Sequence, residues 1–289
     1  MKFIGIDLGW TSGESGLCCL GWENRQLQLL EVDRKQDVHE ILAWVDRWLP
    51  RPDPGAIAVD APTIIPNATG MRLPDKLTHK YFGRYHAGCY PANLQSRFAQ
   101  KTVEFGEALA GRGFAHAPEI VPQKLGRYQI EVFPHPATIN LFGLEKILKY
   151  KKGILAERQA ELTKLCQYIA EVLPNLEPKL NVDVFWQSFA ELLGKNNLGN
   201  QLTLKGKQLK ALEDKIDALL CAYIAAYWWY WGRQRNLVLG DRATGYIVIP
   251  QSQKSDNTCG VGAAVLEPYS AVASQSSTVS PGTRSISES

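Results

Sequence analysis

Two short apolar segments of the chain each end in an aspartate. Residues 3–6 are followed by Asp7, and residues 56–59 are followed by Asp60. An isolated carboxylate in apolar surroundings is costly, so such groups tend to be paired or to bind a metal ion. Mg²⁺ and Mn²⁺ prefer oxygen ligands, and two such ions about 4 Å apart can promote phosphodiester hydrolysis. Aspartate also commonly follows a strand as part of a turn, so neither residue is specific by itself.

Three further acidic residues could join this pair. Glu131 lies within the apolar segment 128–133, while Asp214 and Asp217 lie on a predicted helix over residues 208–231. On that helix Asp217 falls at the margin of the apolar stripe, and Asp214 falls on the solvent side. Glu131 could instead be a salt-bridge partner or face solvent, and Asp214 could be a solvated charge. We expect Asp7, Asp60, Glu131 and Asp217 to be catalytic, and the same four residues together with Asp214 to bind two metal ions.

Lysines gather in two places near these acidic segments. One cluster lies at residues 146–152, and a second basic stretch runs over residues 195–215. Phosphate contacts supply much of the affinity for nucleic acid, and they come mainly from Lys and Arg. We therefore expect Lys151 and Lys152 to bind substrate beside the carboxylates. A solvated helix face would show the same pattern.

Two histidines are further candidates for substrate binding. His135 follows Glu131 by four residues and could act as a general acid or base, or it could be a turn residue between two prolines. His86 opens the segment H-A-G-C-Y-P-A-N, which could line a pocket. A serine or cysteine hydrolase is poorly supported, because no nucleophile lies on a recognisable strand–turn–helix elbow.

The hydrophobic pattern predicts the elements that must position these residues. Because a helix separates two of the predicted strands, we expect a crossover and a parallel strand pair, with functional groups at the carboxyl ends of the strands. Residues 61–126 contain many Pro, Gly and aromatic residues and are predicted to be an irregular insertion after the fourth strand. The predicted strands are 3–7, 16–21, 26–32, 56–60, 128–133 and an edge strand at 245–250, and the predicted helices are 38–49, 154–173, 184–193 and 208–231.

The whole chain fits one domain with a tail. The 289 residues, 45% of them hydrophobic, are enough for one sizeable core over residues 1–250, and the Ser-rich residues 251–289 are predicted to be disordered. A net charge of +3 neither requires nor excludes nucleic acid as a partner. The six cysteines form no C-x-x-C pair, which argues against a zinc finger and favours reduced thiols in a cytoplasmic protein. No apolar stretch approaches about 18 residues, so we expect no membrane association.

Several of these segments resemble a known family. They are F-I-G-I-D-L-G at 3–9, I-A-V-D-A-P at 57–62, I-E-V-F-P-H-P at 130–136, K-Y-K-K-G at 149–153 and D-K-I-D-A-L at 214–219. Together they resemble the domain-of-unknown-function family 429, whose members are regarded as predicted nucleases of the RNase H-like fold. The resemblance covers most of residues 1–250, and it includes Lys151 and Lys152.

The same skeleton is similar to the RuvC Holliday-junction resolvases. Their site uses an Asp on the first strand, an acid on the fourth strand and a D-x-x-D-A-L helix, and Asp7, Asp60, Asp214 and Asp217 match these positions in order. The resemblance implies an α/β fold with a mixed five-stranded sheet flanked by helices, and Mg²⁺ or Mn²⁺ as the metal. Asp60 stands where the resolvases carry Glu, and the 61–126 insertion has no clear counterpart, so a junction substrate is not implied.

Three classes of function follow from these patterns. The first is a metal-dependent nuclease that hydrolyses phosphodiester bonds of DNA or RNA. The second is an ATPase or kinase of the actin-like superfamily, because D-L-G-W-T at 7–11 resembles its first phosphate loop, although such proteins need two domains of this kind. The third is a non-catalytic module that binds nucleic acid, because function does not follow from fold.

Overall fold

The computed structural model describes residues 1–11, 13–182 and 205–251, all within one compact unit of the chain. The predicted helix at 184–193 lies outside the described residues, and so does almost all of the predicted disordered tail at 251–289. In the described part, no helix is long and apolar enough to span a membrane.

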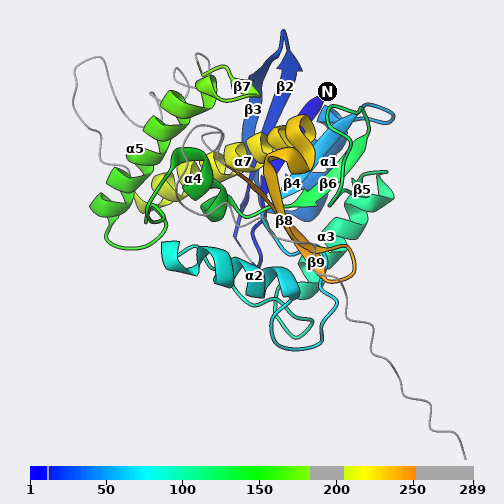
Figure 1. Ribbon diagram of the computed structural model, residues 1–289, viewed down its shortest axis with the longest axis horizontal. Coiled ribbons are helices and arrows are strands. Elements are labelled where there is room, and N and C mark those ends of the chain that lie inside the picture. Colours follow the sequence, from blue (N-terminus) through cyan, green and yellow to red (C-terminus); the bar gives the residue numbers. More distant parts are fainter. Residues whose placement is uncertain (12, 183–204, 252–289) are drawn as a thin grey trace, which may run out of the picture. The chain divides into compact units, whose positions relative to one another are not determined.

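A central sheet organises the described chain (Figure 1). Its strands are β1 (Lys2–Asp7), β2 (Ser15–Glu23), β3 (Gln26–Lys35), β4 (Gly55–Val59), β5 (Ala115–His116), β6 (Arg127–Glu131) and β7 (Lys179–Leu180). They lie in the order β5-β6-β4-β1-β2-β3-β7. β1, β2 and β3 pair antiparallel, whereas β4 and β6 run parallel to β1. The mixed sheet is therefore confirmed, and the two-residue strands β5 and β7 extend the expected five strands to seven.

The strand register determines where the acidic residues lie. β1 and β4 are parallel neighbours with Ile6 opposite Val59, so Asp7 and Asp60 follow at the same edge of the sheet. β4 and β6 are also parallel, with Val59 opposite Glu131. Because the carboxyl ends of parallel strands share one edge, three acidic residues far apart in the sequence become neighbours.

Helices cover both faces of the sheet. The long helix α7 (Gly206–Trp231), with α4 (Pro134–Phe142) and α5 (Leu155–Val172), packs on the face that includes Phe3 and Ala58. α1 (Val38–Trp48) packs with Ile4 and Ile6 on the opposite face. This alternation of buried residues along β1 follows from the two-residue period of a strand, and it explains why an apolar strand with no polar face is stable here.

Glycines allow α7 to lie unusually close to the sheet. A Cβ atom on Gly5 of β1 would lie 2.0 Å from the carbonyl oxygen of Ala218, and one on Gly16 of β2 would lie 1.9 Å from that of Asp214. Such separations are impossible for real atoms, so only glycine fits at these two positions. The close contact brings the acidic turn of α7 directly against the ends of β1 and β2.

The insertion at 61–126 is not irregular, contrary to the prediction. It contains α2 (Leu73–Phe82), α3 (Ala99–Gly111) and the short strand β5. Pro74 lies in the first turn of α2, where a missing N–H costs nothing, so this proline starts a helix rather than breaking one. α3 buries Phe105 and Leu109 against the α1 face of the sheet.

The last two strands form a separate hairpin. β8 (Asn236–Asp241) pairs antiparallel with β9 (Gly245–Pro250), and the pair is distinct from the central sheet. The predicted strand at 245–250 is thus confirmed, but its partner is β8. A single parallel bridge from Val248 to Val132 connects the hairpin to the chain that follows β6.

Candidate active site

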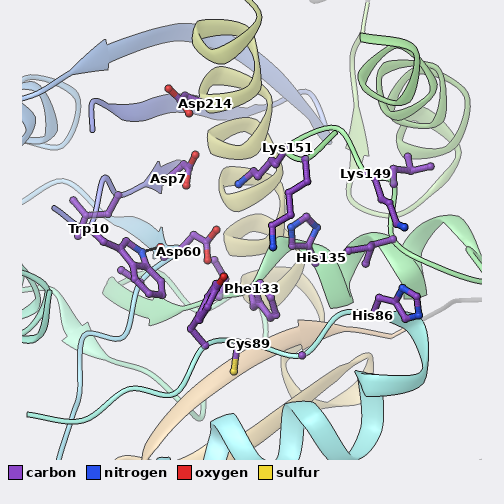
Figure 2. Close-up of a pocket in the computed structure, with 18 of the residues that line it drawn as sticks. Asp7, Trp10, Asp60, His86, Cys89, Phe133, His135, Lys149, Lys151 and Asp214 are labelled. Atoms are coloured by element: carbon purple, nitrogen blue, oxygen red, sulfur yellow. Dashed lines mark hydrogen bonds between the residues drawn. The ribbon is translucent and has the colours of Figure 1, made fainter. Parts of the chain in front are cut away.

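A cavity of about 1200 Å³ opens at the carboxyl ends of β1, β4 and β6. Asp7 and Asp60 lie on one wall, and Lys151 with its neighbouring lysines lies on another (Figure 2). Residues of the insertion close a third side. The lining includes the candidates Asp7, Asp60, Glu131, Asp214, Lys151, Lys152, His135 and His86.

Asp7 and Asp60 are the two partly exposed acidic groups at the sheet edge. Within the described residues, neither carboxylate accepts a hydrogen bond or forms an ion pair, although Trp10 donates to the backbone oxygen of Asp60 at 3.2 Å. Burial raises the pKa of Asp7 to about 6, with Asp217 and Asp214 adding to the rise and Lys151 opposing it. Burial, and next the charge of Asp7, raise the pKa of Asp60 well above its ordinary value. The fold thus holds two carboxylates together without neutralising them.

Asp217 of α7 is fully buried and has two partners. The hydroxyl of Tyr150 donates to its Oδ1 at 2.6 Å, and Nζ of Lys151 lies 2.6 Å from its Oδ2. The prediction placed Asp217 at the margin of the helix, but its side chain is 0% exposed. The close packing of α7 against β1 explains this burial.

Asp214 also lies in the interior, whereas the prediction placed it on the solvent side. Only 1% of this residue is exposed, because the backbone of α7 at Asp214 contacts Gly16. Its Oδ2 accepts hydrogen bonds from Nη2 of Arg34 at 2.8 Å and from Nε at 3.2 Å, and its Oδ1 pairs with Lys210. The helical period alone could not show this, since α7 is buried around nearly its whole circumference.

Glu131 is held in a different arrangement from the other acids. Arg72 of the insertion forms a two-pronged pair with it, Nη1 to Oε2 at 2.9 Å and Nη2 to Oε1 at 2.6 Å. Arg72 also pairs with the buried Asp75 at 2.8 Å. Both oxygens of Glu131 are therefore engaged by Arg72 in this structure. The structure assigns it to an ion-paired triad that ties the insertion to β6.

The two candidate histidines differ in their environments. Burial, and then the positive charge of Lys151, lower the pKa of His135 to about 4, so its imidazole is neutral near pH 7. Its ring lies against those of Phe133 and Tyr150, with centroids 5.6 Å and 5.8 Å away. His86 lies at the far side of the cavity with a left-handed backbone, φ 62°. His135 is thus close to the acidic residues, whereas His86 belongs to the rim.

The carboxylate oxygens of Asp7 and Asp60 are of the kind that binds a divalent metal ion, whereas the other three predicted ligands are already paired within the protein. The carboxylates of Asp7 and Asp60 are hard oxygen donors without partners, which suits Mg²⁺ or Mn²⁺. Among the residues that the structure describes, however, no three His, Cys, Asp or Glu side chains are arranged to share one ion. Asp214, Asp217 and Glu131 are each paired with cations of the protein. Of the five carboxylates predicted to bind two ions, Asp7 and Asp60 are the two without an ion pair among the described residues.

Sequence reasoning missed four groups that form ion pairs or hydrogen bonds with these acids. They are Arg34, Arg72, Tyr150 and Lys210. Lys210 is the fourth residue before Asp214 on one helix, so its pairing could have been found from spacing. Arg72 and Asp75 likewise have helical i,i+3 spacing. Arg34 and Tyr150 gave no such signal, because they approach α7 only through the tertiary fold.

Fold and site together define an α/β protein with a mixed central sheet and acidic residues at the carboxyl ends of its central strands. The model of the family described as "Protein of unknown function (DUF429)" matches residues 5–243, so the chain belongs to that family. No curated protein matches the chain significantly. Among solved structures, it is similar to T. thermophilus RuvC in complex with Holliday junction substrate, with 14% identity and a TM-score of 0.30 over 78% of this chain and 97% of that chain.

Proposed function

We propose that this protein is a metal-dependent phosphodiesterase that hydrolyses DNA or RNA. One observation carries the proposal: Asp7 and Asp60 lie together without partners in a cavity whose other wall carries lysines. A divalent ion bound there would supply a positive charge for the phosphate and would activate a water molecule. The cavity is large enough for a small polar ligand such as part of a nucleic-acid strand, since pockets for small ligands measure about 300–1,000 Å³.

The protein's own side chains have distinct tasks in this proposal. Asp7 and Asp60 would hold the cation through their carboxylate oxygens. Lys152, together with Lys146 and Lys149 on the same wall, binds the nucleic-acid backbone by charge. His135 stays neutral near pH 7, so it contributes a hydrogen bond to the substrate rather than a charge.

The actin-like kinase alternative receives less support. Proteins of that class need two domains of this kind, and the described residues contain one such sheet. The third alternative is a module that binds nucleic acid without cleaving it. It would use the same surfaces as the proposed nuclease, so only a cleavage assay distinguishes the two.

The test is cleavage of end-labelled DNA and RNA oligonucleotides with Mg²⁺, with Mn²⁺ and with EDTA. We expect metal-dependent cleavage by the wild type, and its loss by at least 10²-fold in Asp7→Asn, because the variant loses one of the two free carboxylates. Asp46→Asn is the matched control, since Asp46 is an exposed residue of α1 paired with Arg112. Equal cleavage by Asp7→Asn and wild type would refute the proposal, and binding without any cleavage would favour the non-catalytic module.

A further inference from the structure

Lys151 is a cation that the protein itself places among its acidic residues. Its side chain reaches from one wall of the cavity toward Asp7 and Asp60 on the other (Figure 2). Nζ lies 2.6 Å from Oδ2 of the buried Asp217, and about a third of the side chain, 32%, remains exposed to the cavity. The other oxygen of Asp217 accepts the Tyr150 hydroxyl at 2.6 Å, so the carboxylate is fixed from both sides.

The ammonium form of Lys151 is strongly favoured. Burial acts against the charge, but Asp217, followed by Asp7, raises the pKa of Lys151 well above its ordinary value. Lys151 is therefore not available as a general base near neutral pH. Its ammonium group is a positive charge that the ion pair with Asp217 holds in place. This charge lies next to the place where the substrate phosphate would lie.

An inventory of the neighbouring charges shows which acids still lack a cation. Glu131 and Asp75 share Arg72, Asp217 pairs with Lys151, and Asp214 pairs with Lys210 and with Arg34, which also contacts Glu14. In the part of the chain that the structure describes, Asp7 and Asp60 form no ion pair, and Lys151 beside Asp217 is the main positive charge that acts on both of them. Their combined charge of about −2, when both are ionised, balances the charge of one divalent cation and not of two.

We propose that the site binds a single divalent cation between Asp7 and Asp60, and that the Lys151 ammonium takes the place of a second ion beside Asp217. The inference rests on the proposed function, and it replaces the two metal ions expected from the sequence with one ion and one lysine. Asp217 then acts as a positioning residue for Lys151, and Tyr150 holds Asp217 in place. Lys151 supplies the second positive charge that the phosphate meets.

The count of bound ions tests this inference without an activity assay. Mn²⁺ binding to the full chain is measured by calorimetry, and free Mn²⁺ is counted by electron paramagnetic resonance. We expect one ion per wild-type chain and two ions per chain of Lys151→Met, because the loss of the ammonium leaves Asp217 beside Asp7 without a cation. Lys152→Met removes a neighbouring lysine that has no such pairing, and it should bind one ion.

A second variant guards against misfolding of Lys151→Met. The double variant Lys151→Met/Asp217→Asn removes the cation and the carboxylate together, so no buried charge is left unmatched, and it should bind one ion. Two ions on the wild type, or one ion on a folded Lys151→Met, would overturn the inference and leave the nuclease proposal intact. One ion on the wild type without nucleic-acid cleavage would refute the nuclease proposal alone, and no ion on any variant would refute both.

Discussion

Asp7 is a single residue whose charged form the fold disfavours. Its carboxylate is surrounded by apolar strand residues and by other acids, and it receives no hydrogen bond within the described chain. Strain of this electrostatic kind is typical of functional sites, where stability is given up for reactivity. The raised pKa of Asp7 predicts the direction in which a substitution of Asp7 changes the stability of the protein. This prediction can be tested without an assay of function.

We predict that Asp7→Asn stabilises the protein in EDTA at pH 7.5. The folded-state pKa of Asp7, about 6, is above the ordinary value of 3.8, so its charge opposes folding. The contribution of Asp7 to the free energy of unfolding therefore falls as the pH rises from about 4 to 6, and it stays low above pH 6. The substitution should add about 1–3 kcal/mol at pH 7.5 and little at pH 4, as measured by urea denaturation. Asp46→Asn should add nothing, and a destabilised Asp7→Asn would show that a partner stabilises the charge of Asp7.

At the scale of elements, the contact of α7 with the sheet decides the geometry of the site. Asp214 and Asp217 reach the ends of β1 and β2 only because Gly5 and Gly16 allow the helix backbone to approach. The same approach removes water from both carboxylates, which explains why each one has a cationic partner.

We predict that Gly5→Ala destabilises the fold by about 3 kcal/mol, because the added methyl group would collide with the backbone of α7 at Ala218 and Ala222. Thermal and urea denaturation measure the effect. Gly111→Ala is the matched control, because nothing lies within 4 Å of its added Cβ at the end of α3, and it should be neutral or slightly stabilising. Equal stabilities for the two variants would contradict the close helix–sheet contact.

At the scale of the whole described chain, the insertion at 61–126 is a structural wall of the cavity. It is attached to the central sheet through the buried triad of Arg72, Asp75 and Glu131. A buried charge network of this kind is expensive to break at one member, because the remaining charges stay buried without a partner. The insertion should therefore be coupled energetically to β6.

We predict that Arg72→Met lowers the free energy of unfolding by about 3–5 kcal/mol, because it leaves Asp75 and Glu131 buried without their cation. Urea denaturation at pH 7.5 measures the change. Arg233→Met removes an exposed pair with Glu119 and should cost about 0–1 kcal/mol. A small effect of Arg72→Met would mean that the two acids find other partners or are protonated.

The sequence by itself determined much of the sheet and the positions of its acids. Apolar runs that end in Asp7 and Asp60, separated by the amphipathic helix α1, were sufficient to predict a parallel pair with both residues at one edge. Such local patterns are reliable because burial and the two-residue period of a strand act on neighbouring residues. The helices of the insertion were missed, since prolines at helix starts look the same as prolines that break helices.

Only the tertiary structure decided which acids are free and which are neutralised. Glu131 and Arg72 are 59 residues apart, and Arg34 and Asp214 are 180 residues apart, so no spacing rule connects them. A carboxylate is available to a metal ion only when no Lys or Arg side chain of the protein already forms an ion pair with it. That competition is settled by packing, as α7 brings Asp217 to Lys151 while Asp7 and Asp60, at the strand ends, are left without a partner.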